Sequence, residues 1–483
     1  MATCSRKYCD KVATEEVRGK LYCTECADIA YRFGFDKINT PQVEKEEPQE
    51  KSIKKEEVVQ LYLDGSKQIN VRQVVKYLKR KHTFITVKDA TSRKPHIYIY
   101  EDGYYKLDGD IRLLKTVKDL FKDNWKSLYE NEVTRYLKTE NVVDRDKIHP
   151  PEHLINLKNG IYNLETDELE PHTPNYYFLY KIPVNYNPNA TMPKIMRYFK
   201  STLKQKYIDL SQEIFGYCLL WDYSIAGIFY LYGSGGNGKG VWIHLLTHML
   251  GKENVAEKEI GKLMSNNFAT SGLYGKLANI CGEMSTSVMK STDMLKRLSA
   301  GDNIDAEFKS KDAFSFPNMA KIITACNEIP ECTDMTDGWV QRQYLISFME
   351  KFRKTSRDIT KLRKQLVSNR GEMEGLLFWS LQGLKRLLKN EKFTYENQEE
   401  RYYMCKNSVE YFIENNYAHK DFGDYIEFAK VKSKYEKFCK ENDIPPEKPE
   451  ALGIRLSKLK YSKDRMLNDK GKWIWINRFL VEL

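Results

Sequence analysis

The sequence lacks any apolar run approaching the roughly 18–20 residues that a helix needs to cross a bilayer. Its first residues, which include Cys4, Arg6 and Asp10, also lack the apolar core of a secretory signal peptide. The hydrophobic fraction of 41% suffices for ordinary cores, and the charged fraction of 30% is typical of a soluble protein. We therefore expect a cytoplasmic protein with no membrane partner.

The chain also shows no internal repeat, and its only biased tract is residues 40–57, which are nearly free of apolar side chains. Such a segment cannot bury enough surface to fold alone. The length of 483 residues predicts about two to four domains. Shifts in composition predict these parts in order: a cysteine-bearing module at 1–36, a charged linker at 37–57, a mixed α/β domain at 58–190, a parallel α/β core at 191–395 and a carboxyl-terminal domain at 396–483.

Local patterns predict elements within these parts. The apolar residues of 74–78 have the spacing of one helix face. Residues 95–100 and 103–105 suggest a strand pair around an Asp-Gly turn. The segment 472–476 alternates in character and predicts a strand, and the helical pattern before it is compatible with a winged helix.

Four of the ten cysteines form two closely spaced pairs near the start of the chain. Four thiolates at this spacing can close a tetrahedral zinc site, and a segment this short has little other core. The alternative is four unrelated buried thiols, which the spacing disfavours. We expect a structural Zn²⁺ because no ligand position is left for water. The predicted ligands are Cys4, Cys9, Cys23 and Cys26.

A glycine-rich loop follows an apolar run of strand length at 228–232 and precedes a segment of helical spacing. In this context glycines let successive backbone N–H groups turn toward one point, and the helix N-terminus adds its positive end. A plain strand-to-helix turn is the alternative, but the lysine has the correct spacing for a phosphate loop. The predicted ATP-binding residues are Gly233, Ser234, Gly235, Gly236, Asn237, Gly238, Lys239 and Gly240.

The loop departs from the usual pattern at Gly240, where a serine or threonine normally holds Mg²⁺. Val241 cannot replace that hydroxyl. Magnesium must then depend on a carboxylate, water and the nucleotide itself.

Polar residues follow two further strand candidates. Glu283 comes shortly after 277–281, and Asn327 follows 322–326. Open α/β sheets bind ligands at the carboxyl ends of their strands, so Glu283 could polarise the attacking water and Asn327 could contact the γ-phosphate. Arg342 could act as an arginine finger on the ATP of a neighbouring subunit. Each residue alone could equally be an ordinary surface or turn residue.

The phosphate loop, Glu283, the Thr-Ala-Cys-Asn segment ending at Asn327 and Arg342 resemble, in order and compactness, the superfamily 3 helicases of the phage, plasmid and poxvirus-type primase-helicase branch. This resemblance implies an AAA+-like core, a carboxyl-terminal winged-helix-like domain and a hexameric ring with ATP between subunits. It also implies a hairpin in the ring channel, with Lys309 and Lys311 by position at its tip. The family's usual arginine pair is Gln-Arg here, so only Arg342 is carried over.

The resemblance predicts an ATP hydrolase and DNA helicase or replication initiator, working at the site of replication in its host. Its expected partners are a DNA single strand in the channel, duplex DNA at a fork or origin, and other replication proteins. The excess of 78 Lys and Arg over 67 Asp and Glu is weak support for a polyanionic partner. The resemblance becomes stronger only after roughly the first 150 residues. Those residues are too few to hold a primase domain together with the zinc module and the linker.

Two alternatives remain open. One is an origin-binding initiator in which nucleotide only switches assembly, which the Gly240 departure favours. The other is an ATPase that loads or remodels another replication protein.

Overall fold

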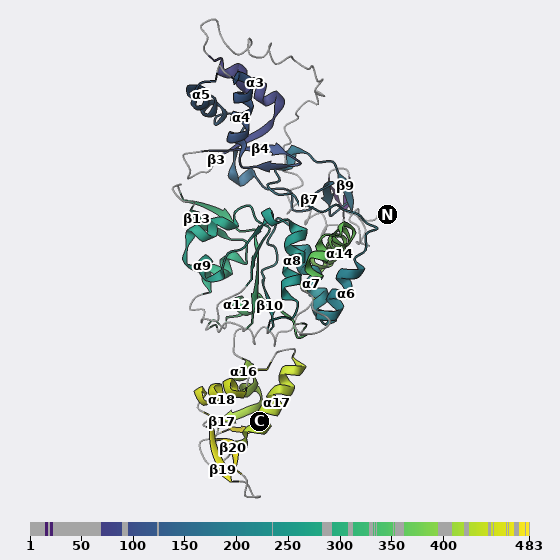
Figure 1. The fold of residues 1–483 in the computed structure, drawn as a ribbon, viewed down its shortest axis with the longest axis vertical. Coiled ribbons are helices and arrows are strands. Elements are labelled where there is room, and N and C mark those ends of the chain that lie inside the picture. Colours follow the sequence, from purple (N-terminus) through teal and green to yellow (C-terminus); the bar gives the residue numbers. More distant parts are fainter. Residues whose placement is uncertain are drawn as a thin grey trace. The chain divides into compact units, whose positions relative to one another are not determined.

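The computed structural model describes residues 15–17, 20–22, 69–88, 95–122, 125–233, 235–282, 292–307, 313–327, 332, 334, 336–350, 352, 362–394, 408–419, 425–442, 446–447, 449–459, 461, 463–467, 473–478 and 480–482. The chain divides into two compact units, and Figure 1 labels their helices and strands. One comprises 1–186 with 310–314, and the other comprises 187–309 with 315–483. Within the described residues, no helix combines the length and apolar character needed to span a membrane.

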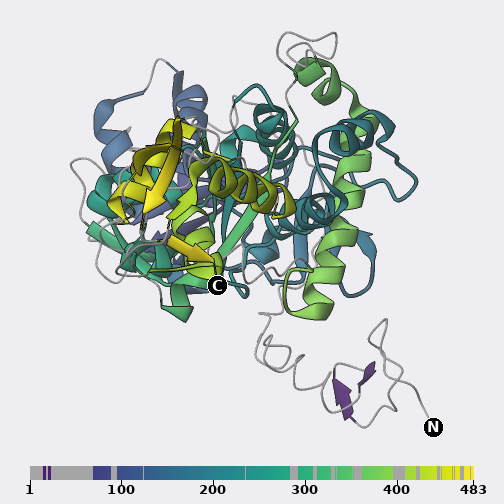
Figure 2. The same cartoon turned by 90° about the horizontal axis from the view of Figure 1, so that it is seen from below.

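The amino-terminal unit contains a small hairpin, a four-stranded sheet with three helices, and a three-stranded sheet. The hairpin of β1 (Glu15–Val17) and β2 (Lys20–Tyr22) is drawn in purple in Figure 2. The four-stranded sheet has the order β5-β4-β3-β6. Its elements are α3 (Val71–Lys81), β3 (Thr83–Lys88), β4 (His96–Glu101), β5 (Tyr104–Lys106), α4 (Gly109–Phe121), α5 (Ser127–Leu137) and β6 (Val142–Asp144). The expected strand pair around Asp102-Gly103 is confirmed by β4 and β5.

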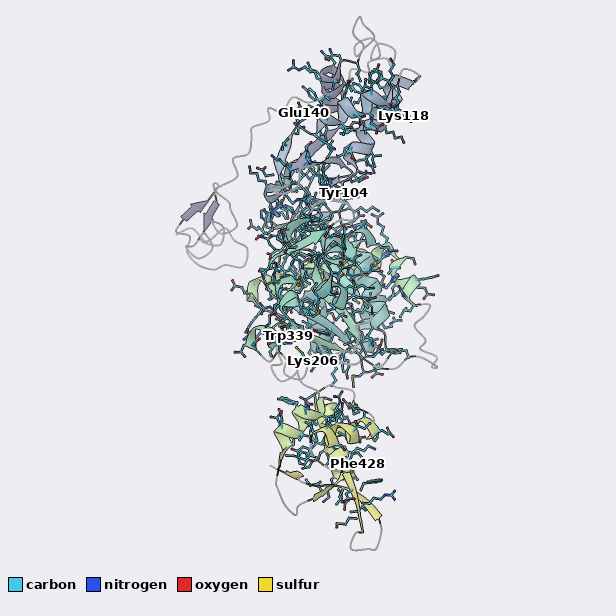
Figure 3. All side chains as sticks on the ribbon, turned by 90° about the vertical axis from the view of Figure 1, so that its left-hand side faces the viewer. Tyr104, Lys118, Glu140, Lys206, Trp339 and Phe428 are labelled. Atoms are coloured by element: carbon cyan, nitrogen blue, oxygen red, sulfur yellow. The ribbon has the colours of Figure 1, made fainter. Side chains whose placement is uncertain are left out.

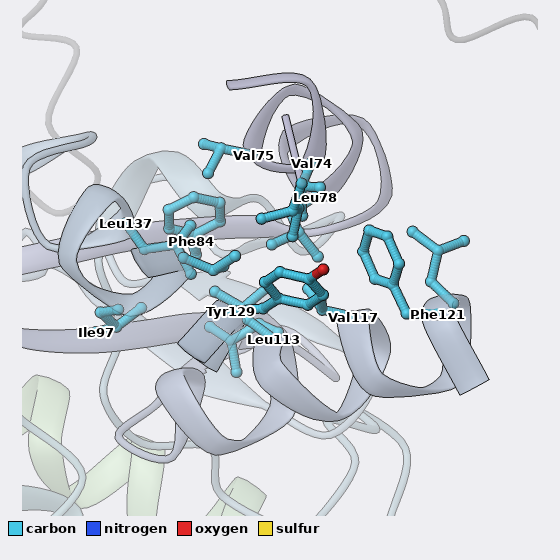
Figure 4. Close-up of a cluster of buried hydrophobic side chains, with 14 residues drawn as sticks. Val74, Val75, Leu78, Phe84, Ile97, Leu113, Val117, Phe121, Tyr129 and Leu137 are labelled. Carbon is cyan, nitrogen blue, oxygen red and sulfur yellow. The ribbon is translucent and has the colours of Figure 1, made fainter. Parts of the chain in front are cut away.

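A single apolar cluster joins the three helices to one face of this sheet (Figure 4). Val74, Val75 and Leu78 point from α3 into the cluster, which confirms the helix face expected from their spacing. Phe84 and Ile97 contribute from the strands. Residues at alternate strand positions, among them Ile85 and Tyr98, face a second cluster, so the sheet is apolar on both sides.

The three-stranded sheet follows in the same unit and is antiparallel, with the order β7-β8-β9. Its strands are β7 (Leu154–Leu157), β8 (Gly160–Asn163) and β9 (Glu168–Glu170). The described 3₁₀ segments of the chain are Arg145–Lys147, Pro174–Tyr176, Lys252–Asn254 and Ser271–Leu273.

The second unit is built around a five-stranded parallel sheet with the order β11-β12-β15-β10-β16. The strands are β10 (Ile228–Tyr232), β11 (Val255–Ala256), β12 (Ala278–Cys281), β15 (Lys321–Cys326) and β16 (Gln343–Ser347). β10 and β15 are buried at every position, as expected of parallel strands covered on both faces. Both strands were expected from their apolar runs, and the parallel α/β core is confirmed.

Helices and one hairpin complete this core (Figures 1 and 2). The helices are α6 (Pro193–Thr202), α7 (Gln205–Tyr217), α8 (Lys239–Leu250), α9 (Ile260–Ser265), α10 (Asn267–Thr270), α11 (Asp293–Leu298), α12 (Asp337–Val340), α13 (Leu362–Val367) and α14 (Arg370–Asn390). The strands β13 (Asn303–Glu307) and β14 (Ala313–Pro317) form a separate two-stranded sheet. α14, the long green helix of Figure 2, packs along α7.

Two buried carboxylates of this core hold helices in place. Glu213 on α7 is fully buried and accepts a hydrogen bond from Arg386 Nε of α14 at 2.7 Å. Glu372, 4% exposed at the start of α14, accepts from the backbone N–H groups of Lys194 and Ile195 at 3.0–3.1 Å. The second carboxylate therefore caps α6 from a helix almost 180 residues away.

The carboxyl-terminal part alternates helices and short strands. Its elements are α16 (Ser408–Asn416), β17 (Tyr417–His419), β18 (Tyr425–Glu427), α17 (Phe428–Glu441), α18 (Pro449–Lys458), β19 (Lys463–Leu467), β20 (Trp473–Arg478) and β21 (Leu480–Glu482). β18, β20 and β19 form a three-stranded antiparallel sheet. The strand expected at 472–476 is confirmed as β20.

Candidate nucleotide-binding site

The glycine-rich loop lies between the carboxyl end of β10 and the amino end of α8. Gly235, Gly236 and Gly238 have φ angles of 84°, 68° and 102°, in the left-handed region that side chains other than glycine rarely adopt. Gly233 is restricted by space as well, because a Cβ there would lie 1.9 Å from the amide nitrogen of Asn237. The glycines are therefore required by the backbone path. Ser234 lies outside the described residues.

Hydrogen bonds to residues outside the loop hold it in place. Asn237 Nδ2 donates to the carbonyl of Phe348 at 2.8 Å, and the N–H of Phe352 donates to the carbonyl of Gly236 at 3.0 Å. The Tyr198 hydroxyl donates to the carbonyl of Gly238 at 3.0 Å. The Asn237 side chain is 2% exposed and is committed to this structural contact, so a phosphate could meet only its backbone N–H.

Lys239 and Asn327 come together at the mouth of the loop. Lys239 Nζ donates to Asn327 Oδ1 at 3.1 Å and to the carbonyl of Gly233. Asn327 can reach it because β10 and β15 are adjacent and in register, with Tyr232 paired to Cys326. The lysine is 9% exposed, so its charge lies in a largely desolvated position at the amino end of α8.

The thiol beside this lysine is not a nucleophile candidate. Burial raises the pKa of Cys326 to about 12, although the charge of Lys239 opposes the shift. The thiol is therefore neutral at physiological pH, and the chemistry of the site rests on Lys239, Asn327 and the backbone amides.

Gly240 is the second residue of α8, and it leaves open space around its Cα. A Cβ built there meets nothing within 4 Å. The carboxylate predicted to act with magnesium, Glu283, follows β12, whose last residue Cys281 is paired with Thr324 of β15. Glu283 itself lies outside the described residues, as do Lys309, Lys311 and the four predicted zinc ligands Cys4, Cys9, Cys23 and Cys26.

Arg342 lies at the amino ends of the parallel strands, whereas the glycine-rich loop follows the carboxyl end of β10. Its carbonyl accepts from the N–H of Ile228, the first residue of β10, at 2.7 Å. One guanidinium nitrogen donates to the carbonyl of Gly338 in α12. A strand of five residues, such as β10, spans roughly 13–17 Å. Arg342 therefore cannot contact a phosphate bound by Lys239 of the same chain.

An ion pair that no sequence pattern predicts links α11 to the segment before Arg342. Lys296 of α11 pairs with Asp334 at 2.5 Å, and the hydroxyls of Thr292 and Thr336 also donate to Asp334. Burial would raise the pKa of Asp334, but these hydrogen bonds hold it well below its usual range. No local motif links these residues, because the two partners of the ion pair are 38 positions apart in sequence.

Two protein-family models match separate parts of the chain. The model described as "D5 N terminal like" matches residues 72–206. The model described as "Family of unknown function (DUF5906)" matches residues 231–343, which include the glycine-rich loop, Asn327 and Arg342.

The chain is also similar to proteins of known sequence or structure. It is 24% identical over 279 residues to the protein named "Putative helicase L207/L206" of Acanthamoeba polyphaga mimivirus, an alignment that covers 55% of this chain and 28% of that protein. The chain thus spans little more than a quarter of that relative. Two apo structures of the NrS-1 C-terminal region align with TM-scores of 0.45 and 0.43 at 14% and 13% identity, covering 85% and 84% of this chain and 99% and 98% of theirs. The D5-like segment and the viral relative support a relationship to D5-type primase-helicases.

Proposed function

We propose that this chain is an ATP-driven DNA helicase or replication initiator of the superfamily 3 type. The observation that carries the proposal is the 3.1 Å contact between Lys239 and Asn327, at the carboxyl ends of two adjacent parallel strands. A glycine-rich loop, a desolvated lysine and a helix N-terminus suit a nucleoside triphosphate. The D5-like match and the similarity to a viral protein named as a helicase favour replication as the setting.

In the proposed mechanism, the loop amides and Lys239 bind the β- and γ-phosphates. In the structure, Lys239 Nζ donates to the carbonyl of Gly233 and to Asn327 Oδ1. When ATP binds, phosphate oxygens would replace these two acceptors. The Asn327 amide would then be released from the lysine and could form a hydrogen bond with the γ-phosphate or orient the attacking water.

Glu283 is proposed to polarise that water, and a carboxylate with the nucleotide would hold magnesium in the absence of a hydroxyl at Gly240. Glu283→Gln should retain ATP binding and lose turnover, because the amide cannot accept the proton. Turnover at the wild-type rate would show that Glu283 does not polarise the attacking water.

Arg342 is proposed to act on the ATP of a neighbouring subunit. Its position at the amino edge of the sheet prevents a role in its own chain's site, and an arginine finger acts on charge that develops at the γ-phosphate. Action between subunits requires a ring or at least a dimer, and the resemblance to superfamily 3 favours a hexamer.

Lys309 and Lys311 are proposed to grip one DNA strand. They fall between β13 and β14, which form a two-stranded sheet as a hairpin in the ring channel requires. Lysine contacts to phosphate are independent of base sequence, which suits a translocating motor.

Two accessory modules complete the proposal. The first is a structural zinc site formed by the two cysteine pairs, which lie in sequence on either side of the β1–β2 hairpin. The second is a winged-helix-like domain. The order of α16, β17, β18, α17, α18, β19 and β20 supports it, since a helix, two short strands, two helices and a hairpin follow one another.

An initiator in which nucleotide switches assembly is the second candidate, and Gly240 favours it because a loop without the magnesium hydroxyl suits binding better than rapid hydrolysis. This candidate predicts site-specific duplex binding with negligible hydrolysis.

The deciding experiment is displacement of a labelled strand from a tailed duplex with ATP and magnesium, comparing wild type with Lys239→Ala. Displacement by wild type alone is the expected result. Tight DNA binding by wild type without displacement would favour the nucleotide-switched initiator.

A further inference from the structure

Asp334 joins two connections that leave the parallel sheet at neighbouring points. β12 and β15 are adjacent, and their last residues lie in register. The chain after β12 passes Glu283 in sequence and enters α11 after Thr292. The chain after β15 passes Asn327 and then reaches Asp334. The Thr292 hydroxyl donates to Asp334, so the two connections meet again at this carboxylate.

The contacts from α11 converge on one oxygen of the carboxylate. Asp334 Oδ2 accepts from the Thr292 hydroxyl and lies 2.5 Å from Lys296 Nζ. Thr292 is the N-cap residue of α11, yet its side chain makes no capping hydrogen bond to that helix. The hydroxyl that would ordinarily cap α11 is therefore directed to Asp334 instead. Both partners of the ion pair are partly buried, so water screens their attraction less than it would at an exposed surface.

The other oxygen of Asp334 fixes the start of α12. Oδ1 accepts from the backbone N–H of Thr336 at 3.0 Å and from its hydroxyl at 2.6 Å. Thr336 is the N-cap residue of α12, and its carbonyl accepts from the N–H groups of Trp339 and Val340 at 2.9 and 3.0 Å. Trp339, labelled in Figure 3, is 1% exposed and anchors the same helix from its buried side. One carboxylate therefore connects α11 to the first turn of α12.

α12 in turn determines where the side chain of Arg342 lies. The backbone N–H of Arg342 donates to the carbonyl of Trp339 at 3.2 Å, and one guanidinium nitrogen donates to the carbonyl of Gly338. Nε of the same side chain is buried and has no hydrogen-bond partner among the described residues. A helix of four residues is not stable by itself, so its position depends on contacts such as those of Asp334. A shift of α12 would therefore shift the guanidinium.

We propose that Asp334 is a positioning residue for the arginine finger. This inference rests on the proposed function, in which Arg342 contacts the ATP of a neighbouring subunit. In this role Asp334 holds α12 to α11 and keeps the guanidinium within reach of that nucleotide. Because the segment that contains Glu283 leads directly into α11, Asp334 also connects the proposed water-activating residue of one site to the arginine that serves the next.

The first part of the test measures ATP binding and steady-state hydrolysis by Asp334→Asn in the whole chain. The amide retains an acceptor for Thr336 but loses the ion pair with Lys296. The dissociation constant for ATP should stay at the wild-type value, because the variant's own phosphate loop is intact. The kcat should fall about 100-fold, which is the loss expected when a catalytic group is displaced by about 1 Å.

The second part mixes Asp334→Asn with each of two other inactive variants and measures turnover. With Lys239→Ala, turnover should recover in part, because Asp334→Asn supplies an intact phosphate loop and its neighbour supplies a correctly placed arginine. With Arg342→Ala, turnover should not recover, because neither protein supplies such an arginine. A role within its own nucleotide site would give the opposite pattern, and a general folding defect would give no recovery in either mixture. Both of these outcomes would overturn the proposal.

The mixture of Lys239→Ala with Arg342→Ala separates this inference from the proposed function. Failure of that mixture, with mixed oligomers confirmed, would refute the finger between subunits and Asp334's role with it. Recovery by that mixture, without recovery by Asp334→Asn and Lys239→Ala, would overturn only the role of Asp334.

The matched control is Glu140→Gln, which removes the ion pair between Glu140 and Lys79 in the amino-terminal unit (Figure 3). It has the same change of charge and should keep the wild-type kcat. An equal loss of kcat in Glu140→Gln and Asp334→Asn would reduce the effect to the loss of an ion pair and overturn the proposal.

Thermal melting verifies folding of each variant. If Asp334→Asn fails to melt cooperatively, Thr292→Val replaces it, because valine has the shape of threonine without the hydroxyl that donates to Asp334. Thr292→Val should show a smaller loss of kcat and the same pattern of recovery. A wild-type kcat for Thr292→Val, or recovery with Arg342→Ala instead of Lys239→Ala, would overturn the proposal.

Discussion

Gly240 occupies the position where a phosphate loop usually carries the hydroxyl that holds magnesium. The open space around its Cα means that a hydroxyl could be restored without a clash. We expect Gly240→Ser to lower the magnesium concentration for half-maximal ATP turnover about tenfold, because it adds a ligand. Gly240→Ala is the matched control, since it also adds a Cβ to the helix but supplies no hydroxyl ligand. Equal magnesium dependence in Gly240→Ser and Gly240→Ala would show that the added hydroxyl does not bind magnesium.

Lys321, the first residue of β15, is a buried amine outside the candidate nucleotide-binding site. Its Nζ donates to the carbonyl of Leu220 at 2.5 Å and lies over the rings of Tyr217 and Tyr223. Burial lowers the pKa of Lys321 to about 8 from its ordinary value of 10.5. Between these two values the unfolded chain binds more protons than the folded one, so stability rises with pH in this window.

This shift predicts a pH-dependent difference between wild type and Lys321→Met. Protonation of the buried amine below pH 8 costs the wild type about 3 kcal/mol, and this cost disappears as pH rises toward 10.5. The free energy of unfolding of wild type relative to the variant should therefore increase from pH 7.5 to pH 10 by about 2–3 kcal/mol, as measured by urea denaturation. A difference that does not change with pH would show that the amine titrates normally.

At the scale of whole elements, α6 depends on a carboxylate from a distant helix. Glu372 accepts from the first free N–H groups of α6, at Lys194 and Ile195. Glu372→Ala should reduce the free energy of unfolding by about 1–3 kcal/mol, because these donors would be left without a partner. Glu372→Gln keeps one acceptor oxygen and should cost less. A loss within about 0.5 kcal/mol for the alanine variant, as at an ordinary surface site, would contradict the capping role.

The elements that sequence alone predicted are those with local signals. The row of apolar residues in β10, the glycines of the loop and the spacing of Val74 and Leu78 each fix an element through its immediate neighbours. The proximity of Lys239 and Asn327 could also be expected. Each residue lies beyond the carboxyl end of a parallel strand, and these ends lie on the same side of the sheet. The roles of these residues in ATP turnover stay predictions.

The features that sequence could not predict depend on contacts between distant residues. The Asn237 side chain, part of the predicted loop, donates its amide to the carbonyl of Phe348, 111 positions away, and no local pattern predicts this contact. The Lys296–Asp334 pair and the Glu372 cap likewise connect residues with no shared motif. Charged and polar side chains of this kind resemble ordinary surface residues until the fold brings their partners together.

At the scale of the whole molecule, the position of Arg342 leads to a test of assembly. Lys239→Ala should lack ATP binding and Arg342→Ala should lack the finger, so each protein alone should be inactive. Mixed in equal amounts, they should recover part of the wild-type turnover, because some interfaces would join an intact Lys239 to a neighbour's intact Arg342. ATP hydrolysis measured over a range of mixing ratios tests this. Absence of any recovery, with mixed oligomers confirmed by tagged pull-down, would exclude a finger acting between subunits.

β16 lies between the proposed arginine finger and the residue that anchors the glycine-rich loop. Arg342 immediately precedes it, and Phe348, which immediately follows it, anchors the phosphate loop through Asn237. The strand is buried throughout and hydrogen-bonded along its whole length to β10, so it cannot shorten or bend independently. In a ring, a pull on the arginine by one subunit's nucleotide would therefore be transmitted to the loop that grips the next nucleotide. The subunits would then hydrolyse ATP one after another, and the rate of turnover would depend on ATP concentration sigmoidally rather than hyperbolically.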